Sequence, residues 1–180
     1  MKRFLALILV FVLGAFLVSC EDDGWKVDEV FTYKDISNWV GMVTPDAGAA
    51  GSVVETDDDE GFVSIKGGES GWGGIQSGEI TLDLKRDPLI FIRIFENNDP
   101  FKWGMKFLPN DSSEEHEWGI YLFEDNNFKH KKYAVVDVND QIGEALEEYG
   151  DKVTGVLWVF PAGHEDATVE VMEIKIVYQK

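Results

Sequence analysis

Short apolar runs separated by turn signals follow one another along most of the 180-residue chain. About eight or nine of them have strand character. Glu79 to Leu84 alternates polar and apolar residues, as a half-buried strand does. Leu89 to Phe95, with the single exception of Arg93, and Val153 to Phe160 are apolar on both sides and predict central strands covered on both faces. A succession of this kind is typical of all-β sandwiches and barrels.

We expect a β-sandwich with one short helix. The main alternative is a lipocalin-like up-and-down barrel, which needs one continuous alternation per strand, and two strands that are apolar on both sides fit it less well. The alternation of the last strand changes phase near Met172-Glu173 and predicts a bulge there. Asn139 or Asp140 can cap a helix that runs through Tyr149 and ends at Gly150, closing one end of the sandwich.

The first residues have the build of a secretory signal. Lys2 and Arg3 precede an apolar run of 15 residues, Phe4 to Val18, which is shorter than the roughly 20 residues that span a bilayer as a helix. The Leu-Val-Ser-Cys sequence that ends at Cys20 resembles a bacterial lipobox, which implies cleavage before Cys20 and attachment of lipid to it. A plain signal peptide, or an N-terminal anchor helix with an incidental Cys20, is the alternative.

This interpretation divides the chain into a signal peptide over 1–19, a lipidated tether over 20–26 and one sandwich domain over 27–180. The mature chain would have 180 − 19 = 161 residues, which suits a single domain. We expect it in the cell envelope, outside the cytoplasm, anchored to a membrane by its lipid. Cys20 is the only cysteine, so no intramolecular disulfide can form.

The formal charge is −18, from 34 acidic and 16 basic residues. Such a surface disfavours nucleic acid and anionic lipid headgroups as partners, so the predicted membrane contact is the lipid. Aromatic residues make up 13% of the chain. They provide ample apolar area for a core and leave some for a binding face.

The glycine-rich segment from Gly67 to Gly74 lacks the motifs of a phosphate-binding loop, and strand-like sequence follows it. Trp72, near its end, is either a lid over the core or a platform for stacking. The acidic run from Asp57 to Glu60 favours a solvated turn over a calcium site, because it lacks the spaced ligands of a calcium loop.

No constellation of residues points to catalysis. The three histidines, His116, His130 and His164, lie in separate predicted loops. The sequence from Glu114 to Glu117 predicts a solvated turn. No serine has the setting of an activated nucleophile. We therefore expect no enzyme, although a pair of glutamates brought together by folding could make a glycan hydrolase or lyase.

Four stretches resemble the galactose-binding-like jelly rolls, which include many carbohydrate-binding modules. They are the Gly-Trp-Gly-Gly turn that contains Trp72, the strand Pro88 to Ile94, the strand Val153 to Val159 and the closing strand Val169 to Ile176. The resemblance covers Val27 to Tyr178. It implies a concave sheet face or an end-loop cleft where aromatic rings stack on sugars, often beside a structural calcium whose ligands the sequence does not single out.

Strand parity selects the candidate binding residues. If Ile92 and the residues two positions before and after it face the core, Arg93 projects from the opposite face of its sheet. In the same way, Trp158 points away from the core if Leu157 faces it. Tyr121 points away from the core if its neighbours along the strand face it. The predicted binding face is Arg93, Tyr121 and Trp158, with Trp72 and Lys106 at its rim. Core packing is the alternative for each aromatic residue, and a salt bridge is the alternative for Arg93.

Flat apolar rings beside fixed hydrogen-bonding groups are what recognition of a sugar requires. The sequence therefore predicts a surface-anchored lipoprotein that binds an oligosaccharide or polysaccharide without catalysis. The alternative is an envelope lipoprotein whose sandwich holds a protein partner in an assembly. No cofactor is expected beyond the calcium that the resemblance admits.

Overall fold

The computed structural model describes residues 24–44, 48–49, 54–67, 73–97, 102–125, 133–162 and 166–179. The expectations for the signal segment and Cys20, for Trp72, and for His130 and His164 lie outside the described residues. In the part that is described, no helix is long and apolar enough to cross a membrane.

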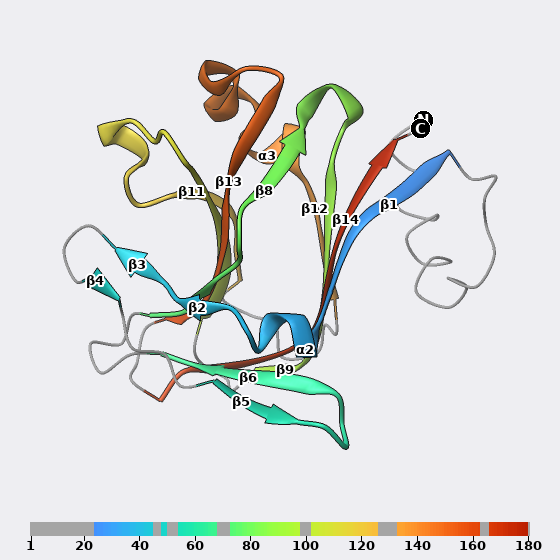
Figure 1. Ribbon diagram of the computed structural model, residues 1–180, viewed down its shortest axis with the longest axis vertical. Helices are drawn as coiled ribbons and strands as arrows, with labels where there is room; N and C mark the ends of the chain where they lie inside the picture. Colours follow the sequence, from blue (N-terminus) through green and yellow to red (C-terminus); the bar gives the residue numbers. More distant parts are fainter. Residues whose placement is uncertain are drawn as a thin grey trace.

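Two antiparallel sheets form the body of the domain (Figure 1). Sheet A contains, in spatial order, β12 (Tyr133–Asp137), β9 (Leu89–Asn97), β14 (Thr168–Gln179), β6 (Phe62–Lys66) and β5 (Val54–Asp57), with β1 (Trp25–Thr32) also paired to β14. Sheet B contains β11 (Ile120–Asp125), β10 (Lys102–Pro109), β13 (Lys152–Ala162), β7 (Ile75–Gln76) and β2 (Val40–Gly41), with β8 (Ile80–Asp83) also paired to β13. The strands β3 (Val43–Thr44) and β4 (Gly48–Ala49) pair only with each other.

The expected fold class, an all-β jelly-roll sandwich with a short helix, is confirmed. The chain crosses repeatedly between the sheets, from β8 to β9, from β9 to β10, from β11 to β12, and then through β13 to β14. Figure 1 shows β11, β13 and β8 in one layer and β12, β14 and β1 in the other. The barrel alternative is wrong, because the described strands divide into separate sheets.

The core lies between the two sheets and is built from alternate residues of their strands. On β9, Ile90, Ile92 and Ile94 are buried in it, and Leu157 and Val159 enter it from β13. The neighbours of these residues along each strand therefore point outward. The predicted bulge is also present, because the register of β14 against β9 shifts between Val171 and Glu173.

The two strands that are apolar on both sides differ in what covers them. Both are central in their sheets, as predicted. On the outward side of β13, Trp158 and Phe160 are buried. On the outward side of β9, Arg93 is exposed and Phe91 is half-buried, so the expectation that β9 is covered on both faces is wrong.

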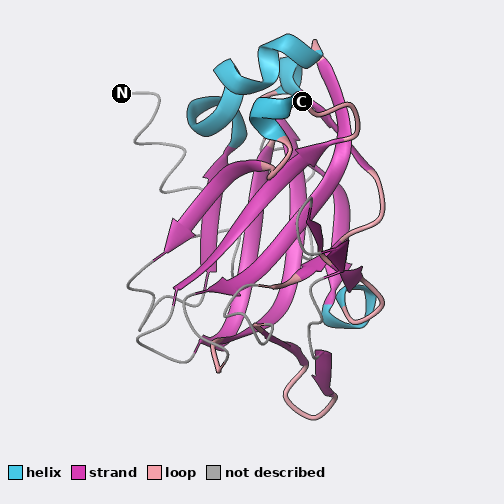
Figure 2. Cartoon of the chain, turned by 90° about the vertical axis from the view of Figure 1, so that its left-hand side faces the viewer, coloured by secondary structure: helices cyan, strands magenta, loops and turns pink. Residues whose placement is uncertain are grey.

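The predicted helix is α3 (Val138–Leu146), which is followed by a 3-10 turn, Glu147–Tyr149. Its cap is Asp137 and not Asn139 or Asp140, because β12 continues to Asp137 and leads directly into the helix. The Asp137 carboxylate accepts a hydrogen bond of 3.1 Å from the Asp140 N–H. Gly150, with φ +91, ends the segment as expected. Helical segments gather at one end of the strands (Figure 2), and α2 (Tyr33–Ile36) lies toward the other (Figure 1).

The acidic run forms the turn between β5 and β6, as its sequence favours. The Asp57 carboxylate accepts hydrogen bonds from the N–H groups of Asp59 and Glu60, at 3.0 and 2.9 Å. Gly61 follows with φ +76. Across the described ranges, no three His, Cys, Asp or Glu side chains come together as a metal site.

Candidate functional site: two outer faces of the sandwich

The structure separates the predicted binding residues onto opposite sheets. Arg93 lies on β9 in sheet A, whereas Tyr121, Lys106 and Trp158 lie on β11, β10 and β13 in sheet B. All of them point outward, as parity predicted. The outward sides of two packed sheets face in opposite directions, so the prediction that Arg93 shares one face with Tyr121 and Trp158 is wrong.

The outer face of sheet B, here the Lys106 face, consists of Lys106, Tyr121, Trp158 and Phe160. Lys106 pairs in register with Tyr121 on one side and with Trp158 on the other. Its Nζ lies 4.1 Å from the centroid of the Tyr121 ring. The same Nζ donates a hydrogen bond of 2.9 Å to the carbonyl of Trp118. Lys106 therefore covers part of the Tyr121 ring and ties β10 to the loop before β11.

Trp158 is not available for stacking on a ligand, because its side chain is only 1% exposed. It forms a small second cluster with Met42 and Phe160 on the outside of sheet B. Met42 follows β2, and its N–H donates to the carbonyl of Gly74 at 2.9 Å. The alternative weighed for Trp158, burial by packing, holds, although the packing lies outside the main core.

The outer face of sheet A, here the Arg93 face, consists of Phe62, Phe91, Arg93, Phe95 and Tyr133. Phe91 and Tyr133 stack with ring centroids 6.0 Å apart and planes 12° apart. Phe62 and Phe95 stack with centroids 4.8 Å apart and planes 21° apart. Arg93 lies between the two pairs along β9, since it is two residues from both Phe91 and Phe95. A guanidinium is thus placed between two stacked aromatic pairs.

The charge environment of Arg93 leaves its guanidinium open. In the sheet register Glu173 of β14 stands opposite it. The Glu173 carboxylate instead pairs with Lys175 at 2.7 Å, and these two side chains are only 25% and 12% exposed. Among the described residues, the guanidinium of Arg93 has no hydrogen bond or ion pair, and only its backbone is paired, with β12 and β14. The salt bridge weighed as the alternative for Arg93 is therefore not formed there.

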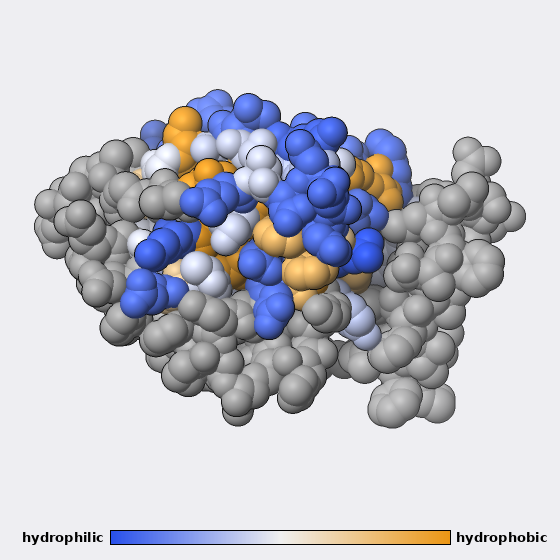
Figure 3. Space-filling view, turned by 90° about the horizontal axis from the view of Figure 1, so that it is seen from below, coloured by the Kyte–Doolittle hydropathy of each residue, from blue (hydrophilic) through white to orange (hydrophobic). Residues whose placement is uncertain are grey.

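Aliphatic side chains extend the same sheet surface at its two sides. Val135 of β12 is 36% exposed and is paired with Phe91. Val30 of β1 is 43% exposed and is paired with Lys175. Seen from the side where β5 and β6 lie in Figure 1, hydrophobic residues form patches among hydrophilic ones (Figure 3). Such a surface can bind flat apolar groups and anions together.

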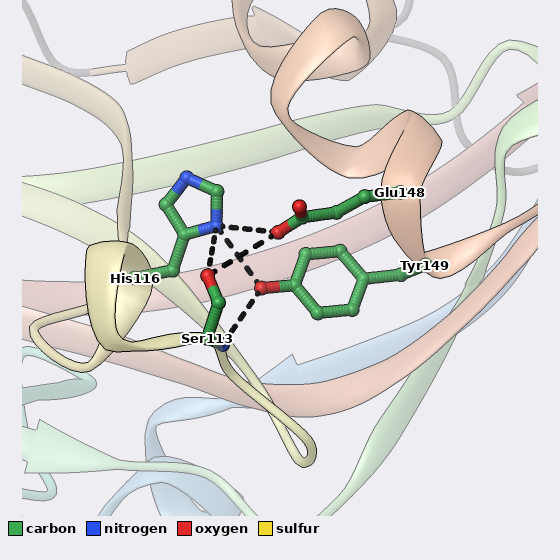
Figure 4. A network of polar contacts seen from close by, with 4 residues as sticks. All are labelled: Ser113, His116, Glu148 and Tyr149. Carbon is green, nitrogen blue, oxygen red and sulfur yellow. Dashed lines mark hydrogen bonds and ion pairs between the residues drawn. The ribbon is translucent and has the colours of Figure 1, made fainter.

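The predicted turn around His116 is present and belongs to a polar network (Figure 4). His116 Nδ1 lies 2.9 Å from Glu148 Oε1, 3.0 Å from the Tyr149 hydroxyl and 3.5 Å from Ser113 Oγ. In a Ser-His-carboxylate triad the histidine uses both ring nitrogens: one contacts the serine nucleophile and the other contacts the carboxylate. Here all three groups converge on one nitrogen, so the network joins the β10–β11 loop to the end of the α3 segment.

The network predicts a pH dependence of stability. Hydrogen bonding by Tyr149, and then by His116, lowers the pKa of the Glu148 carboxyl below its ordinary value of 4.5. A carboxyl with a lowered folded pKa stabilises the fold above its unfolded pKa, and this contribution is lost as the pH falls through the folded pKa. We expect Glu148→Gln to be less stable than the native chain at neutral pH, with a difference that shrinks below pH 4.5. Thermal melts of both proteins over the acidic and neutral range check this, and a difference that grows toward acid would contradict it.

Sequence reasoning missed Tyr133, Phe91 and Phe95 as members of a binding face. The signal for the two phenylalanines was present, because they share the parity of Arg93 on one strand. Tyr133 could not be found in this way. It joins the face only because β12 pairs with β9 and sets Tyr133 opposite Arg93.

Comparisons with known proteins give no family for the chain. No family model matches it, and no curated protein matches it. Among solved structures it is similar to a low-affinity xylan-binding module, CBM86, from Roseburia intestinalis, with 9% identity and a TM-score of 0.49 over 82% of this chain and 92% of that one. It is also similar to a structure of accessory secretory proteins 1, 2 and 3 in Streptococcus pneumoniae, with 12% identity and a TM-score of 0.39 over 76% of this chain and 95% of that one.

Proposed function

We propose that this protein is a lipid-anchored envelope protein whose sandwich binds a carbohydrate without catalysis at the Arg93 face. The lipobox-like sequence ending at Cys20 supports the anchor. The strongly acidic surface, with a formal charge of −18, supports a lipid as the membrane contact in place of a basic patch.

The observation that carries the binding proposal is the pair of aromatic stacks on either side of an open guanidinium. Aromatic rings provide apolar contact for the C–H faces of sugars, and a guanidinium provides fixed donors for their oxygen atoms. Phe91 and Phe95 are four residues apart on β9, which corresponds to roughly 13 Å along a strand. That separation exceeds a single sugar ring and favours an oligosaccharide or polysaccharide.

Tyr133→Ala tests the proposed face, and the chain offers a matched control on the other sheet. Tyr133 and Tyr121 are both exposed strand tyrosines, at 38% and 43%. We expect Tyr133→Ala to weaken polysaccharide binding about tenfold, since the loss of one stacking contact of roughly 1.4 kcal/mol gives that factor. Tyr121→Ala should bind as the native protein does. Affinity electrophoresis and calorimetry with a panel of soluble neutral and acidic polysaccharides measure the effect.

Two outcomes would contradict the proposal. If Tyr121→Ala loses binding and Tyr133→Ala keeps it, the site is the Lys106 face. If the native protein binds no polysaccharide in the panel, carbohydrate binding itself is wrong.

A protein partner is the second candidate function, and the exposed valines favour it. Val30 and Val135 broaden the Arg93 face into a larger apolar surface. Its aromatic residues and its arginine are residue types that are enriched in protein interfaces. If the panel shows no binding, but a cross-linked envelope protein is lost specifically from Tyr133→Ala, this second function replaces the first.

A further inference from the structure

Resting on the proposed function, we infer that the carbohydrate is acidic, and that the carboxylate of a uronic acid residue pairs with the guanidinium of Arg93. The inference deepens the proposal for the same face and follows from three features. They are the open guanidinium, the rings beside it and the way the neighbouring carboxylate is held.

The guanidinium is kept open by its surroundings. The chain has 34 acidic residues against 16 basic ones, so an arginine on its surface has many carboxylates as candidate partners. The one opposite Arg93 in register, Glu173, is held by Lys175 at 2.7 Å. Because that pair is mostly covered, the charge of Glu173 is neutralised and its side chain is held in place. Glu173 therefore neither forms an ion pair with Arg93 nor repels an incoming anion.

A guanidinium without an ion-pair partner binds a carboxylate in preference to a hydroxyl. Its planar fork donates two parallel hydrogen bonds to the two oxygens of a carboxylate, which is a stronger and more directional contact than one to a hydroxyl. Within the described residues no other group competes for these donors. A neutral sugar would leave much of this capacity unused.

The aromatic rings place a sugar ring next to that carboxylate. Tyr133 is directly opposite Arg93 across the β12–β9 pair, and Phe91 stacks on Tyr133 from the same side of the sheet. A ligand that rests its ring on this pair brings a substituent toward Arg93. A uronic acid has both the apolar ring face and the carboxylate, whereas a simple organic anion lacks the ring.

The negative charge of the whole protein does not prevent this contact. Charges separated by more than about 8 Å are largely screened at physiological ionic strength. The neutralised Glu173–Lys175 pair lies next to Arg93 in the sheet register, and the carboxylates of Glu96 and Glu170 lie further along β9 and β14. Direct, partly desolvated contact with the guanidinium outweighs the screened repulsion from distant carboxylates.

The experiment compares each acidic polysaccharide with its own carboxyl-reduced form. Polygalacturonate, alginate and hyaluronate are used as probes, each in its native form and after reduction of its carboxylates to alcohols. The native protein is compared with Arg93→Gln and with Arg86→Gln. The second variant makes the same change of charge outside the Arg93 face, where the guanidinium lies 4.7 Å from the Tyr178 ring. Thermal melts establish that each variant is folded.

We expect at least one native acidic polymer to bind about tenfold or more tightly than its reduced form. Arg93→Gln should abolish that preference, so that the native and the reduced form of the polymer bind this variant with equal affinity. Arg86→Gln should keep the preference.

Equal binding of native and reduced polymers, or an Arg93→Gln variant that still prefers the native polymer, would overturn the acidic-sugar inference and leave carbohydrate binding standing. The absence of binding to every polymer, including neutral ones, would overturn the proposed function as well. Binding of free carboxylates as tight as that of the polymers would also overturn the inference, because it would show that the ring contributes nothing.

Discussion

Gly155→Ala is expected to lower the free energy of unfolding by about 3 kcal/mol or more. Gly155 lies on β13, where it is paired with Pro109 of β10 and Ile80 of β8. A Cβ at this position would overlap the carbonyl oxygen of Leu108 and would lie 2.8 Å from Cζ of Phe107. Because the first obstacle is backbone in a paired strand, a side-chain rotation cannot relieve it.

Gly78→Ala is the control for Gly155→Ala. A Cβ on Gly78 would meet nothing within 4 Å. We expect this variant to change the free energy of unfolding by less than about 0.5 kcal/mol. Denaturant unfolding followed by tryptophan fluorescence measures both variants, and a Gly155→Ala variant as stable as Gly78→Ala would contradict the close approach of β10 and β13.

Trp158→Ala is expected to cost about 3 to 5 kcal/mol, the range for truncating a buried large aromatic side chain. Trp158 is 1% exposed and packs with Met42 and Phe160, so its loss empties the second cluster. Trp118, which is 38% exposed, gives the control. Trp118→Ala should cost less than about 1 kcal/mol.

The same variants separate a structural role for Trp158 from a role in binding. Trp158→Phe keeps much of the packing and should preserve polysaccharide affinity, because Trp158 lies on the sheet opposite to Arg93. Chemical denaturation and calorimetry together check both statements. A Trp158→Ala protein of unchanged stability that has lost polysaccharide binding would contradict this account and restore Trp158 as a stacking residue.

The sequence predicted the strands and their parity well, because alternation is a local property. It placed the bulge near Glu173, the buried sides of β9 and β13, and the helix that ends at Gly150. The cap at Asp137 was missed because the strand and the helix are contiguous, with no loop between them to mark the boundary.

The alternation along a strand shows which residues point outward, but it does not show on which of the two outer faces of the sandwich they lie. It placed Arg93 and Trp158 outside their sheets correctly, but the two sheets have opposite outer faces, and membership of a sheet depends on long-range pairing. Nor could it show what covers a face. β9 and β13 look alike in sequence, yet Met42, more than a hundred residues before Trp158 in the chain, packs over β13 alone.

The lipid anchor is an inference from charge, length and the Leu-Val-Ser-Cys sequence, and it stays a prediction. The role of Trp72 as a lid or as a platform likewise stays a prediction.

The most direct test of the central claim is a map of backbone amide chemical shifts during titration with oligosaccharides cut from the polysaccharide that binds best. Carbohydrate binding at the Arg93 face predicts that the largest shifts follow β9 and β12, at Phe91, Arg93 and Tyr133, while Lys106 and Tyr121 on the opposite sheet stay unmoved. Shifts concentrated at Lys106 and Tyr121, with β9 and β12 unchanged, would contradict it.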